Sequence, residues 1–272
     1  AIRRQRQMCI RDRYITNGME KGKKPEQYLF TITEEFTNDW NTFKNKASEN
    51  KQNISNLLRN TVSSKINNDK KKKALVLSPH TDDAELGCGG TIAKLIEEGW
   101  AVHVIYFSAV RTRFPQLVNE AENSARILGM SYEILDFNTR YFPRDRQDIL
   151  QILHDHSRKE NYNLVFTPTT TDIHQDHGVV TTEAKRIFRK CTLLGYELPW
   201  NNLDVSLNCF IPLEKRHIKK KISALECYNT QKKHPYFDKK FLESVVKMRG
   251  VQLSTPFAEG FETIKVRLDQ LI

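Results

Sequence analysis

Two short clusters of histidine and aspartate are the residues of this sequence best suited to catalysis. Their members are His80, Asp82 and Asp83 in the first cluster and His174, Asp176 and His177 in the second. A catalytic zinc ion usually takes three protein ligands of these kinds and leaves a position open for water. Two histidines and one carboxylate supply such a set, and they leave a histidine and a carboxylate for charge stabilisation and proton transfer. Together the clusters predict a mononuclear metal site.

Helix capping is the alternative interpretation of the same residues. Asp82 or Asp176 could satisfy free amides at the start of a helix. For one cluster alone, capping explains the residue types as well as chemistry does. Capping does not require two histidines and two aspartates to recur in two loops that face each other, so the presence of both clusters favours the metal site.

Strands and helices alternate from Ala74 onward, which brings the two clusters to the same edge of a sheet. Apolar runs and helical spacing predict these elements over residues 74–77, 88–98, 101–107, 115–128, 131–137, 144–159 and 163–167. The alternation is typical of an α/β fold with a mainly parallel sheet. Each cluster follows a strand, and ligands bind where parallel strands end. We therefore expect the clusters to face each other there.

Positive charge is concentrated at the amino terminus. The 272 residues have a net charge of +10, of which residues 1–73 contribute +9 and residues 74–272 contribute +1. Residues 1–18 predict a disordered basic tail; they also resemble a translated sequencing adapter, in which case the native start is Met19. Apolar spacing over residues 30–66 predicts amphipathic helices, which either pack on the catalytic domain or dock a partner. We expect a helical and disordered basic arm before the catalytic domain.

Composition limits the class of protein. The five cysteines are odd in number and include no CxxC pair, which argues against a disulfide framework and a structural zinc knuckle. No apolar stretch approaches the roughly 20 residues of a membrane span, and the amino terminus lacks the apolar core of a secretory signal. We expect a soluble, cytoplasmic protein without a membrane span. The nearly neutral domain predicts no nucleic-acid partner, and a homo-oligomer stays open.

Both clusters resemble the motifs of a known family. The strand followed by SPHTDDAELG, with IHQDH later in the chain, is similar to the LmbE/PIG-L family of zinc-dependent N-deacetylases. Thr81 stands where the family motif has a proline, and KMRGVQLSTPFAEGFE resembles the closing segment of the family. The resemblance covers residues 74–272. It implies a Rossmann-like three-layer fold, one Zn²⁺ per chain, and a small-molecule substrate with an N-acetylated amino sugar of the N-acetylglucosamine type.

The resemblance also implies a role for each member of the clusters. The zinc ligands would be His80, Asp83 and His177. Asp82 would be the general base, and His174 would stabilise the oxyanion while Asp176 orients it. We expect His174 to be protonated in the reactive state, because an imidazolium is the better electrophile. The reaction hydrolyses the acetamide and releases acetate and a free amine.

Substrate recognition has weaker signals in the sequence. Arg113 is a candidate for binding a phosphate or carboxylate of the substrate, because guanidinium makes bidentate bonds to such groups; Arg111 and Arg249 are further candidates. Glu259 could bond sugar hydroxyls. Aromatic side chains that could stack on a pyranose are Tyr196 and Trp200.

Other residues invite chemistry and are better explained by structure. The sequence GCGG at Gly87 to Gly90 is not GxGxxG, so we interpret these glycines as close packing between strand and helix. His103 alternates within a strand and is predicted to be a structural histidine. His154 and His156 are two residues apart on a helix, so their side chains point to different faces, and we expect both on the surface.

Two rival functions remain at the level of sequence. A metallophosphoesterase could use similar ligands, although it usually holds two metal ions. A non-enzymatic protein could bind nucleic acid or a membrane surface through the basic arm. The number of metal ions and the release of acetate separate both rivals from a deacetylase.

Overall fold

The computed structural model of this chain describes residue 45 and residues 71–110 and 114–270. The predicted basic tail and, apart from residue 45, the predicted helices of residues 30–66 lie outside the described residues. The division into an arm and a catalytic domain therefore stays a prediction. The described elements belong to one compact unit, Lys71–Ile272.

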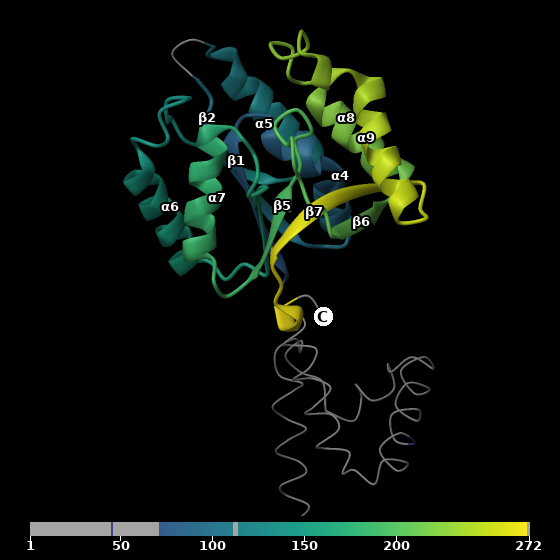
Figure 1. The fold of residues 1–272 in the computed structure, drawn as a ribbon, viewed down its shortest axis with the longest axis horizontal. Coiled ribbons are helices and arrows are strands. Elements are labelled where there is room, and N and C mark those ends of the chain that lie inside the picture. The colour runs from purple at the N-terminus through teal and green to yellow at the C-terminus, as the bar shows by residue number, and fades with distance from the viewer. Residues whose placement is uncertain (1–44, 46–70, 111–113, 271–272) are drawn as a thin grey trace, which may run out of the picture. The chain divides into compact units, whose positions relative to one another are not determined.

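A seven-stranded sheet lies at the centre of this unit (Figure 1). Its strands are β1 (Lys73–His80), β2 (Ala101–Ser108), β3 (Ser131–Ile134), β4 (Leu164–Pro168), β5 (Thr192–Tyr196), β6 (Cys209–Leu213) and β7 (Phe257–Lys265). They are arranged in the order β3-β2-β1-β4-β5-β7-β6. The first five strands in this order pair in parallel, and β7 pairs antiparallel with both β5 and β6. The prediction of a mainly parallel sheet is confirmed.

Helices cover both faces of the sheet and produce three layers (Figure 1). The longer helices are α4 (Asp83–Glu97), α5 (Gln116–Leu128), α6 (Arg146–Lys159), α7 (Gln175–Ile187), α8 (Lys215–Leu225) and α9 (Lys239–Gln252). The described residues also form two short 3₁₀ helices, Pro235–Phe237 and Leu268–Gln270. Figure 1 shows α6 and α7 on one face and the other four long helices on the opposite face. No helix among the described residues is long and apolar enough to cross a bilayer.

The central strands are buried on both sides, which explains their continuous apolar runs. In β1, Ala74 and Val76 belong to the core under α4 and α5, whereas Leu75 and Leu77 belong to the core under α6 and α7. All four side chains are fully buried. Successive residues of a strand point to opposite faces, so one apolar strand anchors both helical layers.

The chain reverses its direction across the sheet between β1 and β4. The strands β2 and β3 extend to one side of β1, and β4 and β5 extend to the other. Connections that leave two neighbouring strands in opposite directions open a crevice at their carboxyl ends. His80 is the last residue of β1, and the second cluster follows β4 directly. This topology brings the two clusters together.

Helix α4 begins earlier than the sequence predicted. Its first residue is Asp83, and a kink at Cys88 interrupts it. A Cβ added to Gly87 would lie 2.2 Å from the Tyr196 ring, and one added to Gly90 would lie 2.6 Å from Leu213. The interpretation of these glycines as close packing is confirmed. The start at Asp83 places the first cluster across the amino terminus of the helix.

Candidate active site

Three side-chain atoms from the two clusters form a nearly equilateral triangle. His80 Nδ1 lies 3.2 Å from His177 Nε2, and Asp83 Oδ2 lies 3.3 Å from each of these nitrogens. His80 ends β1, Asp83 opens α4, and His177 lies in the first turn of α7. Asp83 Oδ2 also accepts the backbone N–H of His80 at 2.8 Å, which fixes the carboxylate in the triangle.

The triangle matches the ligand shell of a tetrahedral metal ion. Ligand distances of about 2.0–2.2 Å place the atoms of such a shell about 3.3–3.6 Å apart. Burial by itself would lower the pKa of His177, but Asp83 and Asp172 raise it to about 10. The charges around the triangle therefore favour a cation at its centre. The two histidines and one carboxylate are the donor set that a catalytic zinc ion takes, so the residues fit the metal predicted from the sequence.

A second carboxylate holds each histidine of the triangle by its other ring nitrogen. His80 Nε2 lies 3.1 Å from Asp176 Oδ2, and His177 Nδ1 lies 2.8 Å from Asp172 Oδ2. Such partners fix the orientation and tautomer of a metal-binding imidazole. The sequence reasoning missed Asp172, although its position just before the second cluster was a usable signal. The backbone N–H of Arg140 binds Asp176 in turn, at 2.6 Å.

Asp176 therefore has a partner other than the one expected. We expected it to orient His174, but its carboxylate contacts the ring of His80 instead. The backbone N–H of Asp176 donates to Nδ1 of His174 at 3.2 Å. The reason is local geometry: Asp176 follows the His174 cap in the first turn of α7, and its carboxylate contacts His80 at the end of β1.

His174 combines helix capping with proximity to the triangle. Its ring stacks on His177 with 4.6 Å between centroids and meets His80 edge-on at 4.8 Å. Nδ1 accepts the backbone N–H of Asp176, so the neutral ring carries its proton on Nε2. Burial, followed by the charges of His177 and His80, lowers the pKa of His174. These findings favour a neutral imidazole that donates from Nε2, not the imidazolium that we expected.

Asp82 lies between His80 and Asp83 in the chain and has an unusual backbone conformation. Its φ is 122° and its ψ is −25°, a region that side-chain-bearing residues avoid. The side chain is buried but makes no hydrogen bond within the part of the chain that the structure describes, and it does not cap α4. Burial and the neighbouring Asp83 raise the pKa of Asp82 well above its usual value. Strain of this kind concentrates at functional sites.

The family comparison agrees with the arrangement of these residues. Residues 75–188 match the PIG-L family, described as GlcNAc-PI de-N-acetylase. This segment contains both clusters, most of β1 and all of β4. The chain contains a PIG-L family domain. The family expectation from the two sequence motifs is confirmed, and the family supports a hydrolase.

Individual relatives extend beyond the segment matched by the PIG-L family. An uncharacterised deacetylase of Escherichia coli K12, YaiS, is 26% identical over 167 residues, which are 58% of this chain and 90% of the relative. The 4-carboxy-2-hydroxymuconate hydratase GalB of Pseudomonas putida has a TM-score of 0.63 at 24% identity, covering 72% of this chain and 97% of GalB. The N,N'-diacetylchitobiose deacetylase of Pyrococcus horikoshii has a TM-score of 0.58 at 20% identity, covering 75% and 90%. The two structures confirm the fold, and their different reactions show that the fold alone does not select the chemistry.

The structure changes the interpretation of the predicted substrate-binding residues. Arg113 lies outside the described residues. Glu259 is only 4% exposed, and its carboxylate accepts the Lys221 ammonium at 2.7 Å and the amides of Gly90 and Thr91 at 3.0 and 2.7 Å. Both carboxylate oxygens of Glu259 are therefore engaged by groups of the core, beside the kink of α4. The interpretation as a substrate ligand is wrong because β7 carries this residue into the core.

Arg249 and Tyr196 are also engaged within the fold, whereas Trp200 is only partly buried. Both oxygens of Glu197 accept hydrogen bonds from Arg249, at 2.8 and 2.7 Å, and Tyr196 is fully buried with its hydroxyl bound to the carbonyl of Leu77. Trp200 stacks on Tyr236 with 4.1 Å between ring centroids.

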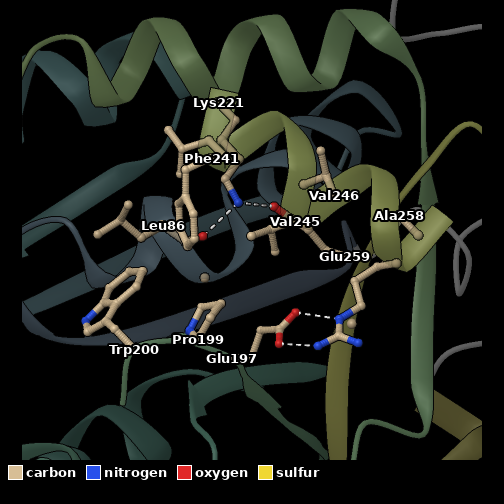
Figure 2. Close-up of a pocket in the computed structure, with 14 residues that line it drawn as sticks. Leu86, Glu197, Pro199, Trp200, Lys221, Phe241, Val245, Val246, Ala258 and Glu259 are labelled. Atoms are coloured by element: carbon tan, nitrogen blue, oxygen red, sulfur yellow. Dashed lines mark hydrogen bonds and ion pairs between the residues drawn. The ribbon is translucent and has the colours of Figure 1, made fainter. Parts of the chain in front are cut away.

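A small cavity lies between these engaged groups. Figure 2 shows Glu197, Lys221 and Glu259 around it, with Trp200 at one end. Arg249, the partner of Glu197, also lines the cavity. The cavity measures about 20 Å³, which accommodates about one water molecule. It is too small for a sugar and contains no member of the two clusters.

Proposed function

We propose that this protein is a metal-dependent N-deacetylase that hydrolyses the acetamide of an N-acetylated amino sugar. The observation that carries the proposal is the triangle of His80 Nδ1, Asp83 Oδ2 and His177 Nε2, with edges of 3.2–3.3 Å. These three residues would hold one zinc ion at the carboxyl ends of β1 and β4. A zinc ion bound there supplies Lewis acidity and lowers the pKa of a bound water from 15.7 to about 7.

Asp82 is the proposed general base and proton carrier. Its carboxylate has no hydrogen-bond partner within the described part of the chain, and it directly precedes a residue of the triangle. A raised pKa makes a carboxylate a stronger base. Asp82 takes a proton from the attacking water as the new C–O bond forms. It then delivers that proton to the sugar nitrogen as the C–N bond breaks, which yields acetate and the free amine.

His174 is the proposed donor to the developing oxyanion. Its Nδ1 accepts a backbone N–H, so its Nε2–H is available to the carbonyl oxygen of the acetamide. A neutral imidazole held at a helix amino terminus performs this task without giving up its proton. A fixed donor of this kind stabilises the transition state because it needs no reorganisation when charge develops.

The substrate class is proposed on the family description and on the aromatic groups beside the site. The PIG-L family is described by the de-N-acetylation of an N-acetylglucosamine conjugate, and the structural neighbour from P. horikoshii acts on diacetylchitobiose. Burial, followed by the charges of Asp82 and Asp83, raises the pKa of Tyr236, so the first cluster acts electrostatically on this ring. Tyr236 and the stacked Trp200 form an aromatic surface of the kind that packs against sugar rings.

The test is acetate release from a panel of N-acetylated sugars, nucleotide sugars and sugar conjugates. We expect activity with the zinc-loaded protein, loss of activity after chelation, and recovery when zinc is restored. Asp82→Asn should retain zinc at the triangle and lose at least about 10²-fold in kcat, because it removes the proton carrier and leaves the ligands in place.

Two outcomes would reject the proposal. A thoroughly metal-free protein with full acetate release would eliminate the role of the triangle. Phosphate release from phosphoesters without acetate release from any amide would favour the metallophosphoesterase instead. His154→Gln is the control variant, because it replaces a histidine outside the triangle whose side chain is 45% exposed on α6.

A further inference from the structure

A second group of potential metal ligands lies far from the active site. It comprises His103 in β2, Glu133 in β3 and His156 in α6, and one ligand atom from each lies within 4.8 Å of the others. His103 is level with Leu75 of β1, which precedes His80 by five residues. Five residues of a strand span about 16 Å, so the group lies towards the opposite edge of the sheet.

The fold brings these three residues together from separate elements. His103 is paired with Ser131, and Glu133 follows two residues later in the same strand, so both side chains leave the sheet on one face. Helix α6 packs on that face through Ile149 and Leu153. His156 continues their stripe, three residues after Leu153. The expectation that His156 is a surface residue is therefore wrong: its side chain is only 17% exposed.

The contacts within the group prepare nitrogen and oxygen atoms for a cation. His156 Nε2 lies 2.8 Å from Glu133 Oε2, and the His103 and His156 rings stack with 5.8 Å between centroids. The Ser131 hydroxyl donates to the carbonyl of Val102, so its oxygen accepts from His103 Nδ1 at 2.9 Å. The neutral His103 ring then has a free lone pair on Nε2. An ion pair between His156 and Glu133 alone would leave the Nε2 lone pair of His103 unused.

The surroundings allow an ion to enter. His103, Ser131 and His156 line a pocket of about 240 Å³, and the side chain of Glu133 is 42% exposed. The pocket also contains Lys73, which is paired with Glu160, and Lys159. Two imidazoles and one carboxylate suit zinc and neighbouring transition metals, and solvent can complete the coordination.

We propose that His103, Glu133 and His156 form a second transition-metal site, with zinc as its ion, separate from the triangle around His80. An ion bound there would link β2 and β3 to the carboxyl-terminal end of α6. Because the ion binds only the folded arrangement of these elements, it would stabilise the domain.

The test counts zinc ions per chain by equilibrium dialysis of the full-length protein at micromolar zinc. We expect two zinc ions in the wild type. In His177→Ala we expect one zinc ion, bound in the second site. His156→Gln and Glu133→Gln should each retain one ion, in the triangle. The double variant His177→Ala/His156→Gln should retain none. Because His177→Ala lacks a ligand of the triangle, the zinc ion that this variant retains reports on the second site alone and does not depend on the deacetylase proposal.

The matched control is His154→Gln, which replaces a neighbouring histidine on the same helix and should keep two ions. Ser131→Ala should weaken the second site about 10–100-fold, because it removes the partner that fixes the His103 ring. Glu133→Gln on the short edge strand serves if His156→Gln does not fold, as judged by circular dichroism. A single zinc in the wild type that disappears in His177→Ala would overturn the proposal, as would two zinc ions in both His156→Gln and Glu133→Gln.

Discussion

The carboxylate of Asp176 lies 3.1 Å from Nε2 of His80, on the side of the ring away from Asp83 and His177. It also accepts the backbone N–H groups of Arg140 at 2.6 Å and Phe142 at 3.3 Å. Asp176 thus joins the end of β1 to the segment that leads into α6. We expect the position of His80 Nδ1 in the triangle to depend on this contact.

Replacing Asp176 should therefore weaken metal binding without removing a ligand. We expect Asp176→Asn to lower zinc affinity at the triangle about 10–100-fold, because the amide is a poorer acceptor for the His80 ring. Competition with a chelator of known affinity measures the change. Asp155→Asn, at an exposed position of α6, is the control. An affinity within twofold of the wild type would show that the Asp176 contact does not position His80.

The two roles of His174 can be separated by one substitution. Serine is a favoured cap, so His174→Ser should keep the amino terminus of α7 satisfied while it removes the Nε2–H donor. We expect kcat for acetate release to fall about 10²–10³-fold with the zinc content and melting temperature nearly unchanged. His174→Phe loses the cap as well and should cost about 1 kcal/mol more in unfolding free energy. Full activity of folded, zinc-loaded His174→Ser would exclude His174 as the oxyanion donor.

We expect the buried pair of Lys221 and Glu259 to contribute strongly to the free energy of unfolding of the domain. Both side chains are 4% exposed, and Lys221 also donates to the carbonyl of Leu86 at 2.7 Å. Lys221→Met leaves the Glu259 charge without its partner, so we expect the free energy of unfolding to fall by about 3–5 kcal/mol. Urea denaturation followed by circular dichroism measures this loss.

Arg126→Met is the matched control for Lys221→Met, because it breaks an exposed pair with Glu122. The Arg126 side chain is 62% exposed, so its loss should cost less than about 1 kcal/mol. If the two variants lose equal stability, the buried pair does not have the importance that its position suggests.

Much of the fold could be predicted because its signals are local. The apolar runs of β1, β2 and β4 are buried on both faces, and such runs stand out from their neighbours in the sequence. Gly129 ends α5 in a left-handed conformation, with a φ of 89°, as a glycine after a helical pattern indicates. The start of α4 was placed five residues too late because Asp83 and Glu85 are polar, and their burial depends on partners elsewhere in the chain.

The six cluster residues could be chosen from the sequence, since two histidine and aspartate motifs after parallel strands already indicate a shared metal site. The contacts that each of these residues makes could not be predicted from the sequence. Whether Asp176 holds His80 or His174 depends on the direction of a side chain at the start of α7, and Asp172 becomes a partner of His177 only when the loop after β4 is closed.

The sequence by itself determined the types of ligand and the strands that carry them, because periodicity and residue chemistry are properties of short segments. Only the tertiary structure decided which distant residues meet. Glu259, a substrate candidate in the sequence, is the buried partner of Lys221 in the structure. His156, predicted on the surface, lies beside His103 and Glu133. The physical reason is that such contacts arise from the order of strands and the packing of helices, which no local pattern specifies.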